Sequence, residues 1–334
     1  MNIISLVQQL LNIQQHTNAS TTFPLLTLAP VSELSLSLLH TMHQHRLLHV
    51  LDQRCSFMYA DSRRCDQIME LKASNTYKVD GYALYCPTHS GNFSIRRGSF
   101  FMGRRLPLTQ LLYIFYLLSC KSSITSVTTF FKSVKLHRHT VSGILTCLQE
   151  KMWCVLRDRY MPTFNPGDEL EIDEMWLDWT AWDNRVGEDD RFHEWESGMW
   201  IIGLVNRSGT KLWIECIPNR KRTTIQKVVD PMLKSWLFRS PRIYTDALKS
   251  YEYLKHENTH YVINKERDGF VIKESTYWGH CVNIHVNHIE STWKQLRKHL
   301  AMRYAYTSPK HVQLHIAEFV YNWYKLDWYD LIKF

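Results

Sequence analysis

Hydrophobic residues recur with a helical period in four stretches of the first half of the chain. The first stretch, residues 32–51, begins with a serine and repeats its leucines at helical spacing, which is typical of an amphipathic helix. The other three stretches are residues 106–119, 122–133 and 139–156. The last has one apolar face with Thr140 as a candidate cap, and the three together predict a helix-turn-helix.

The pattern changes to strands after residue 166. β-Branched and aromatic runs predict three consecutive strands, at residues 169–177, 199–207 and 211–218. A helix from Thr223 to Leu237 follows, which Pro231 must kink or break. The remaining elements are a strand at 242–247, a helix starting near Ser250, a strand at 260–264, a long loop, and a helix that contains Glu290. This order predicts an α/β domain of the ribonuclease-H-like class.

The predicted elements divide the chain into four parts. An N-terminal extension with a helix occupies 1–54, and its first 32 residues include a polar stretch that we expect to be poorly ordered. A turn-rich segment of short strands, a small ribbon, occupies 55–105. The helix-turn-helix covers 106–160, and the ribonuclease-H-like domain covers 166–334.

Composition indicates a globular protein with a basic surface. Of the 334 residues, 45% are hydrophobic and 13% aromatic, which excludes a disordered chain. The net charge of +8 suits a polyanionic partner such as nucleic acid, although many soluble proteins carry such a charge. We find no secretory signal, and the apolar run 111–119 is too short to span a bilayer, so we expect an intracellular protein.

Three acidic residues stand where an α/β sheet would gather catalytic groups. Asp173 falls in the middle of the first predicted strand, on the same face as Glu171 and Met175. Asp246 ends a later strand, and ligands bind at the carboxyl ends of strands in such sheets. If those two strands are neighbours, a helix packed across the sheet edge delivers Glu290 between the aspartates.

Converging carboxylates repel one another unless a divalent cation neutralises them. Mg²⁺ (or Mn²⁺) is the expected cation, and two ions roughly 4 Å apart would activate a water or a 3′ hydroxyl for phosphodiester cleavage or transfer. Each residue also has a structural explanation. Asp246 suits a turn or helix cap, Asp173 a solvent-facing strand position, and Glu290 the first turn of a helix, where it pairs with Lys294.

Several stretches resemble the DDE transposases of the Merlin type and their bacterial insertion-sequence relatives. In order, they are EIDEMWL, WIIGLVNR, IYTDALKSYEYL, YVINKERDGFV and HVNHIESTW, and they cover roughly Pro166 to Trp323. Earlier, DGYALYC and SIRRGSFFMGRRLPL resemble the segment that precedes the helix-turn-helix in these proteins. The most specific element of the resemblance is formed by His285, Asn287, Ile289, Glu290 and Trp293.

The resemblance implies roles for particular residues. Asp173, Asp246 and Glu290 would be the catalytic, metal-binding triad. His285 and Asn287 would orient Glu290 or contact DNA, although shaping the start of the helix explains them equally well.

The resemblance also implies an N-terminal zinc ribbon made from two cysteine pairs, and here this chain departs from the pattern. Nine residues separate Cys55 from Cys65, and Cys86 is followed by His89 in place of a fourth cysteine. These four side chains supply a tetrahedral set for structural Zn²⁺ if the intervening SFMYADSRR loops out. The alternative is three reduced cysteines and a surface histidine that bind nothing.

Basic residues provide candidate DNA contacts in two places. The first group alternates with Phe100 and Phe101 and consists of Arg96, Arg97, Arg104 and Arg105. The second follows Glu290 on its helix and consists of Lys294, Arg297 and Lys298. Both groups are suited to contact the phosphate backbone of DNA. The alternative is that they are ordinary charged faces in contact with solvent. Weaker candidates for base contact lie in the third predicted helix and are Ser142, Thr146 and Gln149.

These features predict a DNA transposase that binds double-stranded DNA, at terminal inverted repeats and at the target, as a homo-oligomer. It would hydrolyse a phosphodiester at the transposon ends and join the 3′ hydroxyl to target DNA, in the nucleus of a eukaryote or the cytoplasm of a bacterium. One alternative is a domesticated transposase-derived DNA-binding protein without catalytic activity. Another is a zinc-containing interaction protein in which the three carboxylates share no pocket.

Overall fold

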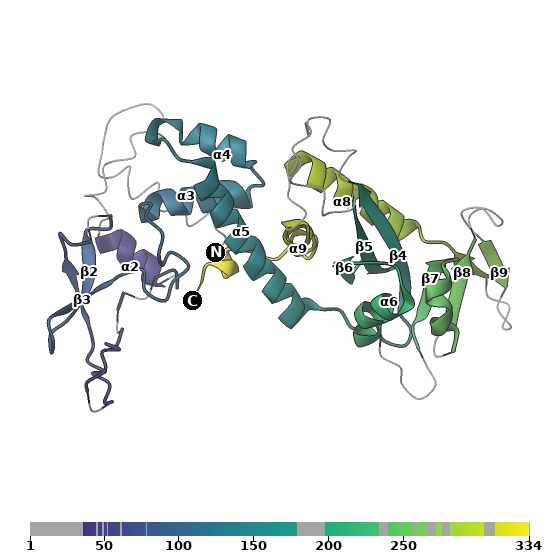
Figure 1. Ribbon diagram of the computed structural model, residues 1–334, viewed down its shortest axis with the longest axis horizontal. Coiled ribbons are helices and arrows are strands. Elements are labelled where there is room, and N and C mark those ends of the chain that lie inside the picture. The colour runs from purple at the N-terminus through teal and green to yellow at the C-terminus, as the bar shows by residue number, and fades with distance from the viewer. Residues whose placement is uncertain are drawn as a thin grey trace. The chain divides into compact units, whose positions relative to one another are not determined.

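The chain divides into two compact units in the computed structural model (Figure 1), residues 1–144 with 327–334, and residues 145–326. The structure describes residues 36–44, 46–48, 50–51, 53–60, 62–77, 79–178, 198–233, 240–256, 259–264, 272–275, 281–303 and 311–333. The polar N-terminal stretch lies outside these residues. The division into four predicted parts remains a prediction.

The first unit combines a small sheet with short helices. The sheet is antiparallel, in the order β1-β2-β3, and its strands are β1 (Glu70–Ala73), β2 (Tyr82–Cys86) and β3 (Gly91–Ser94). This sheet agrees with the short strands that the turn-rich segment predicts. The helices are α2 (Leu36–Gln44), α3 (Leu108–Ser119), α4 (Ile124–Phe130), the first part of α5 (Arg138–Val155), η2 (Lys132–Val134) and η9 (Trp328–Leu331).

The three helices of the predicted helix-turn-helix form where their patterns indicate. In α4 the hydroxyl of Ser123 accepts the N–H of Ser126, which satisfies one of the amides that a helix start leaves free. One polar residue of α5 is not where we expected it. Gln149 is 1% exposed and bonds to His315 and Glu318 in the second unit, so the expectation of base contact at Gln149 is wrong.

The second unit is built on a five-stranded mixed sheet in the order β6-β5-β4-β7-β8. Its strands are β4 (Glu169–Asp178), β5 (Gly198–Asn206), β6 (Leu212–Ile217), β7 (Arg242–Asp246) and β8 (Thr259–Ile263). The first three pair antiparallel, and β4, β7 and β8 pair parallel. Strand β4 lies at the centre of the sheet with β7 as a neighbour, and the sheet is consistent with a ribonuclease-H-like domain.

Helical segments complete this unit. They are α6 (Arg222–Val229), η6 (Asp230–Met232), η7 (Lys249–His256), α8 (Asn287–Arg303), α9 (Val312–Trp323) and the π-helical end of α5, η3 (Leu156–Tyr160). The helix that should cross Pro231 ends at Val229, which confirms the break. The segment before α8 is not simply a long loop, because it contains the antiparallel pair β9 (Ile272–Ser275) and β10 (Cys281–Ile284). Within the described part of the chain, no helix is long and apolar enough to cross a membrane.

Helix α8 packs directly on β4 and β5, and Figure 1 shows it beside them. The approach is close at Gly203 of β5, which pairs with Asp173. A β-carbon at Gly203 would lie 2.4 Å from the Trp293 ring and 2.7 Å from the Ile289 side chain. The absence of a side chain at this position therefore sets the depth at which α8 meets the sheet.

Replacing Gly203 with alanine should force α8 away from the sheet and destabilise the fold by about 1–3 kcal/mol, as other overpacked core positions do. Urea unfolding measures the loss. The matched control is Gly143→Ala in α5, where a β-carbon meets nothing within 4 Å, and where we expect up to about 1 kcal/mol of gain. Equal effects at the two sites would contradict this account of Gly203.

Candidate active site and metal centre

The two candidate aspartates come from neighbouring strands. Strands β4 and β7 pair in parallel, with Glu171 opposite Tyr244. Asp173 and Asp246 each follow that pair by two residues, so the same register carries both to one face of the sheet. Asp173 is 8% exposed, and Asp246 is half-buried at the end of its strand, where its Oδ1 accepts the N–H of Leu248 at 3.0 Å.

Helix α8 brings the third candidate to this face. The indole Nε1 of Trp293 donates a hydrogen bond to Oδ2 of Asp173 at 3.1 Å. Glu290 is half-buried in the first turn of α8, three residues before Trp293, and residues at that spacing neighbour each other on a helix surface. The predicted strand and helix order thus assembles the elements that carry all three residues.

Glu174 adds a further carboxylate, one residue after Asp173 on β4, so strand alternation places it on the opposite face. Burial raises the pKa of Glu174 to about 7, and the negative charges of Asp246 and Asp173 add to the increase. The hydroxyl of Tyr251 donates a hydrogen bond to Glu174, which lowers the pKa and partly offsets the increase. Burial, followed by the charge of Glu174, raises the pKa of Tyr251 well above its usual range. Glu174 therefore feels the negative potential of both aspartates.

Among the described residues, two groups of side chains bring their metal-ligating atoms within 4.8 Å of one another. One consists of Cys55, Cys65, Cys86 and His89, and the other of Glu171, His285 and His288. The triad is not such a group, so its side chains do not surround a single ion in this structure. Two ions about 4 Å apart would bridge a wider set of carboxylates.

The motif residues before Glu290 lie at the start of α8. His285 Nδ1 lies 3.2 Å from Oε1 of Glu171. Burial, with the charge of Arg207, lowers the pKa of His285. Asn287 is exposed and begins the helix. Both positions therefore touch or form the end of α8, which agrees with the helix-shaping explanation of the motif.

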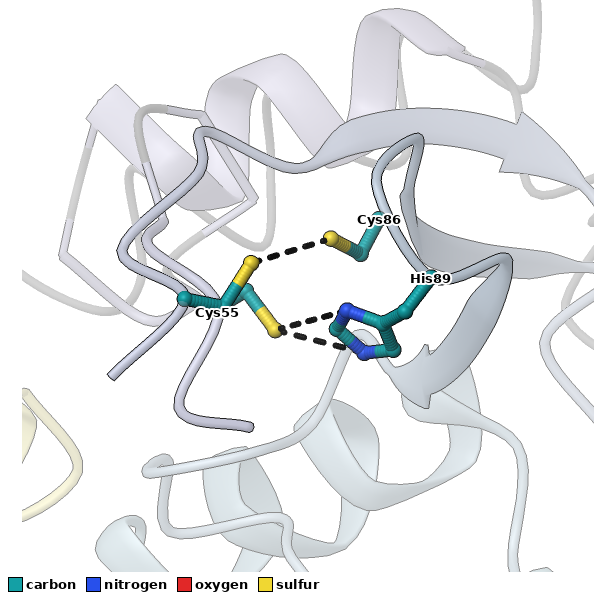
Figure 2. A group of neighbouring side chains, drawn as sticks. Cys55, Cys86 and His89 are labelled. Atoms are coloured by element: carbon teal, nitrogen blue, oxygen red, sulfur yellow. Dashed lines mark hydrogen bonds between the residues drawn. The ribbon is translucent and has the colours of Figure 1, made fainter. Parts of the chain in front are cut away.

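Cys55, Cys65, Cys86 and His89 form a cluster compatible with a zinc ion. Cys86 ends β2 and His89 lies in the following turn, and Figure 2 shows Cys55, Cys86 and His89 converging. The Sγ atoms of Cys65 and Cys86 are 3.7 Å apart, and Cys55 Sγ is 3.5 Å from His89 Nε2. Tetrahedral zinc with ordinary bond lengths predicts about 3.8 and 3.6 Å for these edges. A disulfide would need about 2 Å.

The local backbone favours this cluster. The N–H of Gln67 is the main cause that lowers the pKa of Cys65 to about 6, which favours the thiolate that binds metal. The inserted SFMYADSRR does loop out, since the N–H of Cys65 donates to the carbonyl of Phe57 across a hairpin. Gly91 leaves room for the ligand ring, because a β-carbon there would lie 2.8 Å from His89 Nε2.

The basic candidates differ in exposure. Arg96 is 4% exposed, and its guanidinium bonds to Asp80, at 2.6 Å from Nε, and to the carbonyl of Arg104. Arg96 therefore stabilises the first unit, and we remove it from the DNA-binding set. Arg97 bonds to Ser56 and lies over the Phe93 ring.

The remaining basic candidates are better placed for DNA contact. Arg104 is half-buried with its guanidinium over the ring of Phe100, and Arg105 is exposed. Lys294, Arg297 and Lys298 are all exposed on α8. These side chains can contact the phosphates of DNA without breaking a buried contact.

The fold and this arrangement of acidic residues agree with a ribonuclease-H-like domain of the DDE type. Residues 167–323 match the sequence model of the ISXO2-like transposase domain, which is a DDE transposase domain. Such a domain implies a transposase that acts on DNA with divalent metal ions. No curated protein matches the chain in a sequence comparison.

Replacing Trp293 with phenylalanine keeps most of the ring but removes the donor to Asp173. Loss of a buried hydrogen bond to a charged group should cost about 1.5–3 kcal/mol, measured by urea unfolding. Trp213→Phe is the control, because Trp213 donates to the half-exposed Glu215, where water can substitute for the bond. If Trp293→Phe lowered the free energy of unfolding no more than Trp213→Phe, the indole of Trp293 would not donate to a buried charged partner.

Proposed function

We propose that the chain is a DNA transposase in which Asp173, Asp246 and Glu290 hold two Mg²⁺ (or Mn²⁺) ions. The observation that carries this proposal is the meeting of β4, β7 and α8: the aspartates lie on adjacent strands, and Trp293 ties α8 to Asp173. The family match over the same residues supports it. Within that family, the motif stretches resemble the Merlin type.

The residues fit such ions. Carboxylate oxygens are the ligands that Mg²⁺ prefers. The pKa of Glu174 is raised mainly by burial, and the negative charges of Asp246 and Asp173 raise it further. The ions would activate a water or a 3′ hydroxyl and stabilise the leaving oxygen of the phosphodiester. The chain itself would fix the aspartates through the Leu248 N–H and the Trp293 indole.

The charges around the site suit a nucleic-acid substrate. Lys294, Arg297 and Lys298 follow Glu290 by four, seven and eight residues, so they continue its side of α8. We propose that they hold phosphates of double-stranded DNA beside the carboxylates. Arg97, Arg104 and Arg105 would add backbone contacts from the first unit. Pairing of two transposon ends would require a homo-oligomer, in the nucleus or in the bacterial cytoplasm according to the host.

We also propose that Cys55, Cys65, Cys86 and His89 bind one structural Zn²⁺. The observed ligand separations match a tetrahedral site, and the hairpin between Cys55 and Cys65 accommodates the unusual spacing. The zinc would hold the small sheet against this hairpin, and thus support the segment that precedes the helix-turn-helix.

Asp173→Asn, Asp246→Asn and Glu290→Gln should each lower Mg²⁺-dependent cleavage of a terminal-repeat duplex by more than about a hundredfold. DNA binding should be retained, because the neutral amides preserve shape. A nicking assay measures cleavage and a mobility shift measures binding, with Glu252→Gln, an exposed carboxylate, as the control. A folded triad variant with full metal-dependent cleavage would refute the assignment, whereas an inactive wild type that binds DNA would indicate the domesticated alternative.

The purified protein should contain one zinc per chain by elemental mass spectrometry. Cys86→Ser should remove the metal and lower the melting temperature, because a structural zinc contributes to folding. Cys120→Ser is the matched control, since Cys120 is exposed and lies outside the cluster. Zinc retained in full by Cys86→Ser would exclude this ligand set.

A further inference from the structure

Glu171 is a buried carboxylate to which neither the motif nor the proposed chemistry gives a role. It lies two residues before Asp173 on the same face of β4, and it is 0% exposed. An isolated charge at such a position would be strongly unfavourable, so its partners must hold it firmly. Those partners come from the start of α8 and from the turn after β5.

One oxygen of Glu171 caps α8. Oε2 accepts the backbone N–H of His288 at 2.8 Å and that of Ile289 at 3.1 Å. The first amides of a helix have no partner within the helix, and the helix dipole favours a negative charge there. Glu171 thus acts from the sheet as the capping group of the helix that carries Glu290.

The other oxygen of Glu171 binds Arg207, which reinforces the same contact. Arg207 Nε donates to Oε1 of Glu171 at 3.0 Å, while Nη1 and Nη2 donate to the carbonyls of Asn283 and His285, each at 2.8 Å. The guanidinium also lies 3.5 Å over the ring of Tyr244. One cation therefore joins β4 and β7 to the chain that leads from β10 into α8.

The two histidines near Glu171 raise the alternative of a third metal site. His288 Nδ1 lies 2.8 Å from Oε1, and His285 Nδ1 lies 3.2 Å away. However, Oε1 already receives the Arg207 guanidinium and Oε2 receives two amides, so a metal ion would have to displace a positive charge from the same carboxylate. The contacts favour an anchor for the helix over a metal ligand.

We propose that Glu171 and Arg207 are positioning residues that fix the first turn of α8 and thereby set where Glu290 meets the aspartates. This inference rests on the proposed function of Glu290. The link is short, because Ile289, whose amide Glu171 holds, directly precedes Glu290. Trp293 attaches the next turn of α8 to Asp173, so Glu290 lies between two points at which the helix is attached to the sheet.

The test compares Glu171→Gln with Glu169→Gln in the full chain. Glu169 lies on the same face of the same strand, but its carboxylate bonds to Arg242 and Tyr244 of β7 instead of α8. We expect Glu171→Gln to lower the maximal rate of cleavage at least tenfold and to raise the Mg²⁺ concentration for half-maximal rate. Glu169→Gln should change neither, and DNA affinity should stay the same in both.

Hydrogen exchange provides a second measurement that does not depend on activity. In Glu171→Gln the peptide that spans the first turn of α8 should exchange at least tenfold faster than in Glu169→Gln, while α9 stays unchanged. If Glu171→Gln does not fold, Arg207→Lys serves instead, because it keeps the charge but loses the guanidinium geometry that reaches both carbonyls. It should shift the Mg²⁺ dependence in the same direction.

The outcomes separate the two proposals. Wild-type rates and wild-type exchange in a folded Glu171→Gln would overturn the positioning role. Faster exchange with an unchanged Mg²⁺ dependence would also overturn it, because Glu171 would then stabilise α8 without setting Glu290. A wild type that neither cleaves DNA nor binds Mn²⁺ would refute the proposed function, whereas the exchange result would still show whether Glu171 anchors α8. A stoichiometric transition metal lost on His288→Ala would favour the metal alternative and overturn ours.

Discussion

Charge on the central strand is the constraint on which the second unit depends. Strand β4 lies in the middle of the sheet and carries Glu171, Asp173 and Glu174 within four positions, with Glu171 and Asp173 buried. Burying an ionised carboxylate costs several kcal/mol unless partners compensate it. The neighbouring elements supply those partners, and in doing so they fix their own positions on the sheet.

Each carboxylate is compensated in a different way. Glu171 is paired with an arginine and with the start of α8, and Asp173 accepts a hydrogen bond from the indole of Trp293. Glu174 accepts the hydroxyl of Tyr251, and burial raises its pKa to about 7. The close approach that Gly203 permits is what lets α8 supply two of these contacts. Packing and electrostatics therefore select the same position for the helix.

The sequence was sufficient for the order of the elements, because the period-two pattern of the strands and the break at Pro231 are local signals. It was insufficient where the outcome depends on distant partners. Arg96 resembles its neighbouring arginines in sequence, but Asp80, sixteen residues away, pairs with it in the interior. Gln149 faces His315 and Glu318, more than 160 residues further on. The strands β9 and β10 are four residues long each, too short for their pattern to differ from that of a loop, and among the described residues they pair with each other.

Glu171 shows why site residues are harder to predict than folds. Its position beside Asp173 follows from strand alternation, yet nothing local reveals that its charge is taken up by Arg207 and by a helix start more than 110 residues away. That compensation has a consequence for metal binding. A site with several carboxylates would have to leave some of them for the cation, and Glu171 is already compensated by Arg207. Burial raises the pKa of Glu174, so this carboxylate is also less readily ionised than Asp173 and Asp246 would need to be as ligands. Asp173 and Asp246 then face the helix of Glu290 as the pair whose mutual repulsion a divalent ion would relieve.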